Sequence, residues 1–185
     1  MLASASPRRL ALLQQVGLTP SLVVSPDVDE TPRRDEAPRL YAARMARAKA
    51  QAAPHAGAFV LAADTVVALG RRILPKAADA DEVRACLSLL SGRRHHVLTA
   101  VALVAPDGRM TERVSDSTVA FMRLTPEQLG AYAACGEGVG KAGGYAIQGR
   151  AAGFTRFLSG SYSGVVGLPL WEVCQMLRGR GYPVP

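Results

Sequence analysis

The longest apolar segment of the chain, from Ala58 to Leu69, most constrains the fold. It predicts a long strand that is interrupted only by Asp64-Thr65, and Gly70-Arg71 predicts a turn into a second strand at Ile73-Leu74. A carboxylate inside an apolar strand is costly unless it is paired, hydrogen-bonded or bound to a metal. Functional sites are where this cost is tolerated, so Asp64 is a candidate site residue. The alternatives are a strand end and a local hydrogen bond to Thr65.

Helix and strand signals are mixed along the whole chain. Predicted helix starts carry a capping residue or a proline, at Ser6-Pro7, Pro38, Asp79 or Asp81, Thr125 and Pro169. Further strand patterns lie at residues 22–24, 96–104 and 114–122, with a turn at 106–108. No linker, repeat or break in composition divides the sequence. We therefore predict an α/β fold with a mixed sheet, as a single domain over residues 1–185 with two lobes and a central cleft.

The formal net charge of +7 favours a polyanionic partner without choosing among nucleic acid, acidic membrane and phosphorylated small molecules. The arginines are spread along the chain, and pairs such as Arg33-Arg34 and Arg71-Arg72 fit a solvated surface. Aromatic residues that could stack on bases are few and unclustered, so we expect no nucleic-acid partner. No apolar run approaches the roughly 20 residues of a membrane span, so we expect no membrane partner.

The cysteines and the N-terminal residues suggest a cytoplasmic protein. Cys86, Cys135 and Cys174 are isolated in apolar helical contexts, so we expect buried small hydrophobic side chains in a reducing compartment. Arg8 and Arg9 interrupt the N-terminus before any apolar core of sufficient length, so we expect no signal peptide.

The segment from Ser4 to Arg9 is the first candidate for binding an anion. It joins a very short strand to a helix, whose N-terminus offers free N–H groups and the positive end of the helix dipole. The hydroxyls of Ser4 and Ser6 and the guanidinium groups of Arg8 and Arg9 add donors that match phosphate oxygens. The alternative, favoured for this segment taken alone, is a capped helix with surface arginines. The segment is not a Walker A loop.

An acidic loop and two lysines are the second candidate group. Glu30 lies in the loop 27–32 and, with Asp64, could hold a hard divalent cation through oxygen atoms. Acidic loops are more often simply solvated. Lys49 falls late in its predicted helix, where the helix dipole alone explains a cation, and Lys76 follows the predicted hairpin.

Glycine is concentrated near the C-terminal end, with ten of the 18 glycines between Gly136 and Gly167. So many glycines in one region indicate that the backbone there closely approaches another group. Together with Gln148, they suit recognition of a flat ring by backbone and amide groups.

Taken in order, these segments resemble the Maf family of nucleotide pyrophosphatases over nearly the whole chain. The resemblance is carried by SASPRR, DVDET, ARAKA, AADTVV, LSGRRHHVLTAVAL, GKAGGYAIQG and SGSYSGVVGLPL. It implies a fold like that of inosine triphosphatase and a hydrolase that cleaves nucleoside triphosphates to monophosphate and pyrophosphate. That reaction would use a divalent metal, Mg²⁺ or Mn²⁺, with Glu30 and Asp64 as its ligands.

The resemblance also implies roles for single residues. Asp64 matches the proton acceptor, and Glu30, Lys49 and Lys76 match further catalytic positions. Substrate binding is implied for Ser4, Ser6, Arg8, Arg9, Thr65 and Gln148, of which Arg8, Thr65 and Gln148 match positions linked to base specificity. The chain departs from the family at 74–77, which reads Leu-Pro-Lys-Ala where Gly-Lys-Pro is usual, and at Gly140, where an acidic residue is common.

Three positions indicate the substrate. A sister group that prefers a methylated guanosine triphosphate has an aromatic residue before the arginine pair, Asp-Gln at 64–65 and Glu at 148. This chain has the compact SPRR, Asp64-Thr65 and Gln148, which favour dTTP and UTP, modified pyrimidine triphosphates included. A nucleotide-binding regulator of septum formation with incidental turnover is the alternative, and a nucleic-acid binder comes third. The two carboxylates argue against pure polyanion binding. A homodimer is left open.

Overall fold

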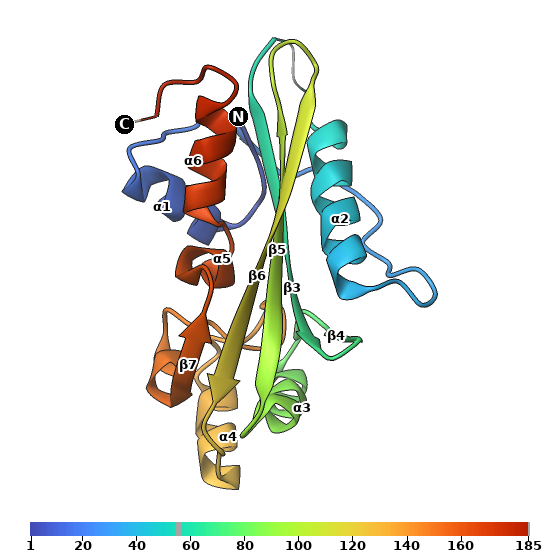
Figure 1. Cartoon of the computed structure of the whole chain (residues 1–185). Coiled ribbons are helices and arrows are strands. Elements are labelled where there is room, and N and C mark those ends of the chain that lie inside the picture. The colour runs from blue at the N-terminus through green and yellow to red at the C-terminus, as the bar shows by residue number, and fades with distance from the viewer. Residues whose placement is uncertain (55–56, 185) are drawn as a thin grey trace.

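The computed structural model describes residues 1–54 and 57–184, and seven strands form one sheet within them (Figure 1). The order across the sheet is β2-β1-β3-β5-β6-β7, and β4 pairs with β3 outside this path. β1 is parallel to β2 and β3, whereas the other pairs are antiparallel, which confirms the predicted mixed α/β fold. The strands are β1 Leu2–Ala3, β2 Val23–Val24, β3 Val60–Leu69, β4 Arg72–Leu74, β5 Arg94–Val104, β6 Met110–Phe121 and β7 Thr155–Ser159.

Most helices begin where the capping signals predict. The helices are α1 Pro7–Gln15, α2 Pro38–Ala52, α3 Ala80–Leu90, α4 Pro126–Ala134, α5 Tyr162–Val166 and α6 Leu170–Arg178, with a 3₁₀ helix at Arg150–Phe154. Asp79 caps α3 by accepting a hydrogen bond from the Glu82 N–H, and Thr125 forms the predicted capping box. Ser6 precedes α1, but its side chain makes no capping hydrogen bond. No helix of the described residues is long and apolar enough to cross a membrane.

Helix α2 covers one face of the central strands and α6 lies on the other (Figure 1). Side chains alternate along a strand, so each face has its own set of residues. Even-numbered residues of β3, such as Ala62 and Val66, pack against α2, whose Ala42 and Ala46 are small. Odd-numbered residues of β3 join the larger core, which includes residues of α1, α3 and α6. Asp64 and Thr65 are consecutive, so their side chains project from opposite faces of the sheet.

The edge of β3 that faces β1 and β4 is open at its centre. β1 pairs with Leu61 and Ala62, and β4 pairs with β3 only from Val67 onward. Residues 63–66 therefore lie in a gap between the two short strands, although β5 pairs with them along the other edge. Asp64 and Thr65, which project from opposite faces of β3, both line one cavity at this gap. The division into two lobes stays a prediction.

Several sequence predictions need correction. β5 begins at Arg94 and β6 at Met110, both earlier than predicted. The ladder between them continues at one end to the Arg94–Ala120 pair and at the other through polar residues of β6 as far as the turn. β7 and α5 were not predicted, since both lie in the glycine-rich region and β7 depends on pairing with the distant β6. Only Cys86 is buried. Cys135 follows the end of α4, and Cys174 is turned away from the inward side of α6, so both are partly exposed.

Candidate active site

A cavity of about 370 Å³ opens at the gap in β3. It is lined by all ten residues that the sequence places in the site: Ser4, Ser6, Arg8, Arg9, Glu30, Lys49, Asp64, Thr65, Lys76 and Gln148. They come from distant parts of the chain: the loop after β1 supplies Ser4 and Ser6, the first turn of α1 supplies Arg8 and Arg9, and the glycine-rich segment supplies Gln148. Residues far apart in the chain thus meet in one place.

Four side chains of alternating charge form a continuous network across this cavity. Lys49 Nζ lies 2.6 Å from Asp64 Oδ1 and 2.6 Å from Glu30 Oε1. Lys76 Nζ donates to the second oxygen of Glu30 at 2.5 Å. Asp64 lies in the middle of β3 and is only 3% exposed, so neither a strand end nor a bond to Thr65 explains it. Lys49 is buried between two carboxylates, so the helix dipole is not a sufficient explanation for it.

Glu30 is held in place by α2 and kept ionised by its neighbours. The Tyr41 hydroxyl donates to the backbone carbonyl of Glu30 at 2.7 Å, and Arg44 donates to the carbonyl of Thr31 at 3.0 Å. Burial raises the pKa of Glu30, but hydrogen bonds from Lys49 and Lys76 outweigh this and lower the pKa to about 2. Hydrogen bonds from α2 and from the two lysines therefore hold the acidic loop at the site.

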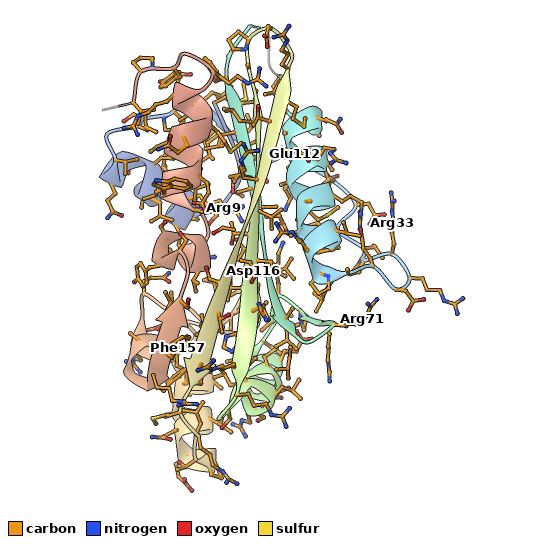
Figure 2. The ribbon with its side chains drawn as sticks, viewed as in Figure 1. Arg9, Arg33, Arg71, Glu112, Asp116 and Phe157 are labelled. Carbon is orange, nitrogen blue, oxygen red and sulfur yellow. The ribbon has the colours of Figure 1, made fainter. Side chains whose placement is uncertain are left out.

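Arg9 is anchored inside the molecule, unlike the exposed Arg33 and Arg71 (Figure 2). Its Nε donates to the Gly167 carbonyl at 2.8 Å, and its Nη1 and Nη2 donate to the hydroxyls of Ser4 and Thr65 at 3.0 and 3.3 Å. Burial lowers the pKa of Arg9, and Asp64 opposes that shift. Arg8 Nε donates to the Val166 carbonyl at 3.4 Å. The surface-arginine interpretation is therefore wrong for this pair.

The hydroxyl of Ser4 is also oriented. Its oxygen accepts from Arg9 Nη1 and from the backbone N–H of Ser6 at 3.2 Å. Because two protons already point at this oxygen, its own hydrogen remains available to a ligand in the cavity. Ser6 itself lines the cavity, and no side-chain cap of α1 engages its hydroxyl.

The glycine-rich segment packs closely against β3 and against the loop that carries Lys76. Gly143 has φ +67°, and a Cβ there would lie 2.7 Å from the Val67 side chain. The segment pairs with the loop that carries Lys76, since Lys76 and Ala142 form a β-bridge and the Gly140 N–H donates to the Ala77 carbonyl at 2.7 Å. Lys76 thus has a defined backbone despite the departure from the usual family sequence, and Gln148 is exposed to the cavity.

The family model described as "Maf-like protein" matches residues 1–180. The chain belongs to the Maf family. It is 60% identical to a dTTP/UTP pyrophosphatase of Rhodospirillum rubrum, over 98% of this chain and 88% of that protein. It is 58% identical to a protein of the same name from Caulobacter vibrioides, over 98% and 95% of the two chains. A Granulibacter bethesdensis protein of that name is 56% identical, over 98% and 93%.

Two solved structures resemble parts of this Maf chain. A nucleoside-triphosphatase / dITP/XTP pyrophosphatase from Mycobacterium abscessus is 23% identical, with a TM-score of 0.38 over 66% of this chain and 72% of that one. The Ham1 protein of Staphylococcus aureus is 15% identical, with a TM-score of 0.44 over 65% and 70%.

Three residues in or beside the cavity of this Maf protein were not predicted as site residues from the sequence. Tyr145 lines the cavity, and its hydroxyl lies 2.8 Å from Nε2 of the buried His95. Lys141 also lines it, and burial followed by the charge of Arg8 lowers the pKa of this lysine. Thr99 touches Thr65 from β5. Threonine is common in strands, so Thr99 gave no signal, whereas Lys141 was visible as a cation among glycines.

Proposed function

We propose that this protein hydrolyses dTTP and UTP, modified pyrimidine triphosphates included, to the monophosphate and pyrophosphate. Relatives that are 54–60% identical over nearly the whole chain carry the name dTTP/UTP pyrophosphatase. The observation that carries the proposal is Lys49 buried between Asp64 and Glu30, in a cavity that the anchored Arg9 also lines. The same proposal places the enzyme in the cytoplasm and leaves a homodimer open.

The phosphate chain would lie along the basic side chains of the cavity. Arg8, Arg9, Lys49 and Lys76 offset its negative charge, and Ser4 and Ser6 offer hydroxyl donors beside the N-terminus of α1. Phosphoryl chemistry depends mainly on such positioning and charge stabilisation. The three bonds that hold Arg9 reduce the entropy that it would lose on binding.

The two carboxylates fit a hard divalent cation that takes its other ligands from substrate. Mg²⁺ is usually bound through one or two carboxylates together with phosphate oxygens and water. Glu30 and Asp64 both reach Lys49 at 2.6 Å, so their oxygens converge on one region. An incoming phosphate would give Lys49 another partner and leave these oxygens available to Mg²⁺ or Mn²⁺. The cation would polarise phosphate oxygens and acidify water.

Asp64 would position the attacking water and accept its proton. Only Oδ1 of Asp64 is needed for the ion pair with Lys49, so Oδ2 can accept a hydrogen bond from water. Burial in β3 keeps this carboxylate in one place, and the ammonium group of Lys49 stabilises its charge. Such general base catalysis contributes about 10²–10⁴-fold to a rate.

The base would be selected by Arg8, Thr65 and Gln148, which line the same cavity. The Gln148 amide offers both a donor and an acceptor. Uracil and thymine present carbonyl acceptors and one ring N–H, so a single amide can satisfy both kinds of group. Cytosine replaces one acceptor by an amino group, which would leave a polar atom unpaired, and purines need more room.

The test is a turnover assay with dTTP, UTP, CTP and GTP, with Mg²⁺ or Mn²⁺ and with excess chelator, in which all products are separated and identified. We expect monophosphate and pyrophosphate from dTTP and UTP, and no turnover in chelator. Release of single orthophosphates, or full activity in chelator, contradicts the proposal. Tight nucleotide binding without turnover would instead favour a regulator.

A variant pair tests the role of Gln148. Gln148→Glu should weaken dTTP and UTP selectively, because an ionised carboxylate has no donor. Gln128→Glu is the matched control, since Gln128 only accepts a bond from the Thr125 N–H in the α4 capping box and a carboxylate can do the same. An equal fall for all four substrates on Gln148→Glu would mean that the residue only supports the glycine-rich segment.

A further inference from the structure

Lys141 is one of only three lysines in the chain, and all three line the cavity. Every other member of the 22 lysines and arginines is an arginine, so outside the cavity each fixed positive side-chain charge is a guanidinium. Lysine instead offers a compact ammonium group with three rotatable donors. Lys49 and Lys76 pair with the two carboxylates of the cavity, so Lys141 is the lysine whose presence there remains to be explained.

Both carboxylates of the cavity already have cations beside them. Glu30 pairs with Lys49 and Lys76, and Asp64 pairs with Lys49. Burial lowers the pKa of Arg9, and the charges of Asp64 and Glu30 oppose that shift, so Arg9 also lies within reach of the carboxylates. These three cations therefore have negative charge near them before any substrate binds.

Arg8 and Lys141 are the cavity cations without such compensation, since neither forms an ion pair within residues 1–54 and 57–184. Arg8 Nε donates to the Val166 carbonyl, while its Nη1 and Nη2 make no hydrogen bond to these residues. Lys141 Nζ donates only to the Val139 carbonyl, at 3.1 Å, which leaves two of its three N–H groups for a ligand. Burial lowers the pKa of Lys141, and the charge of Arg8 lowers it further, so the two cations repel each other.

The backbone of Lys141 is held in place independently of its side chain. Its carbonyl accepts from the Ala77 N–H at 3.2 Å and from the Gly144 N–H at 3.0 Å. Gly140, whose φ of +71° lets the chain turn just before Lys141, donates its N–H to the Ala77 carbonyl. The ammonium group therefore extends from a fixed position, and replacing the side chain leaves these backbone bonds intact.

We propose that Lys141, together with Arg8, binds the pyrophosphate end of the triphosphate. The inference rests on the proposed function. A terminal phosphate carries about −1.5 to −2 charge at neutral pH, more than a bridging phosphate. Cations that no carboxylate compensates attract this group most strongly, because they do not share their charge with another partner. The glycine-rich segment would then contact both ends of the substrate, with Lys141 on the phosphates and Gln148 on the base.

Calorimetric titration with pyrophosphate and Mg²⁺ measures this end of the site without turnover. Lys141→Met, which removes the charge at similar length, should raise the Kd of pyrophosphate about tenfold, the scale of one hydrogen bond to a charged group. Lys141→Gln, which keeps donors but has no charge, should behave in the same way, and Lys141→Arg should retain most of the affinity. Arg123→Met is the control, because it removes an exposed charge outside the cavity and should leave the Kd unchanged.

Turnover and product binding separate the phosphates from the base. In Lys141→Met, kcat/KM for UTP and for CTP should fall by the same factor, about tenfold, so the UTP:CTP ratio stays unchanged. The Kd of UMP, which lacks the two terminal phosphates, should also stay unchanged. A lower UTP:CTP ratio with an unchanged Kd of pyrophosphate would overturn the inference and place Lys141 at the base.

Four further results would overturn the inference. They are no binding of pyrophosphate by the wild type, equal affinity of the wild type and Lys141→Met, an equal loss in Arg123→Met, and wild-type affinity in Lys141→Gln, which would mean that the side chain only supports its own segment. If Lys141→Met does not fold, Lys141→Gln decides the question. Failure of the wild type to release pyrophosphate from UTP contradicts the proposed function itself, a separate outcome that the calorimetric comparison does not depend on.

Discussion

Asp64 and Thr65 are adjacent in sequence, yet they belong to two different chemical environments. Asp64 projects toward α2, where Lys49 and Glu30 surround it with charge. Thr65 projects toward α5, where its neighbours on β5 are neutral at pH 7, and Arg9 of α1 donates to its hydroxyl. Because one edge of β3 is unpaired between β1 and β4, both faces reach one cavity. One strand can therefore supply a reactive group and a selective group side by side.

The neutral face holds even a titratable residue uncharged. His95 lies two residues before Val97 on this face of β5, packed between Phe121 and Tyr145. Burial, and to a lesser extent His96, lower the pKa of His95 to about 4. The charged face differs, because its buried ions are retained by direct pairing. We therefore expect substitutions on the charged face to affect stability and turnover, and those on the neutral face to affect pH response and selectivity.

The largest expected effect is on stability when the buried charge loses its partner. Lys49→Met should destabilise the protein by about 3–5 kcal/mol, since it leaves Asp64 buried without its counter-ion. Arg47→Met, on the same helix, is the control, because the Arg47–Glu112 pair is exposed where β6 passes α2 (Figure 2) and should contribute only about 0–1 kcal/mol. Urea denaturation measures both, and equal losses would remove the distinction between the two environments.

His95 should make stability depend on pH from the neutral face. The unfolded protein binds a proton on His95 near pH 6.5, whereas the folded protein does so only near pH 4. Its contribution is therefore complete above pH 6.5 and is lost as the pH falls to 4, about 3 kcal/mol in total. His95→Gln should flatten the stability curve in this window. His96→Gln, at an exposed neighbour that lowers the pKa of His95 only to a lesser extent than burial, should flatten it much less, and a curve unchanged by His95→Gln would show that the residue is not held neutral.

Turnover should depend on the charge of Asp64. Asp64→Asn should keep the fold and most nucleotide binding while lowering kcat by on the order of 10²-fold or more. Single-turnover rates and calorimetric binding of UTP separate the two effects. Asp116→Asn, on exposed β6, is the control and should leave kcat unchanged. A fall of only a few-fold in Asp64→Asn would exclude the carboxylate as the proton acceptor.

Local signals predicted most of this structure. Pro7, Pro38, Asp79 and Thr125 start helices where expected, because capping depends on a few neighbouring residues. All ten residues that the ordered motifs assigned to the site line the cavity. β7 was not predicted, because its strand exists only through pairing with β6.

The environment of each site residue was harder to predict. Lys49 resembled an ordinary residue near a helix C-terminus, because nothing in the local sequence reveals that Asp64 lies opposite it. Thr99 is one of several small residues in a buried strand. Only the register of β3 against β5 shows that it touches Thr65. Such tertiary relations are absent from the pattern of any single segment.

The most direct test of the division between the two faces is one set of kcat/KM values for UTP and CTP. They are measured by pyrophosphate release on wild type, Asp64→Asn and Thr65→Val. We expect Asp64→Asn to lower both substrates strongly and leave their ratio unchanged. Thr65→Val should lower the UTP:CTP ratio about tenfold, since it removes one hydrogen-bonding group that the proposed function assigns to the base. A changed ratio in Asp64→Asn, or an equal fall for both substrates in Thr65→Val, would contradict the account.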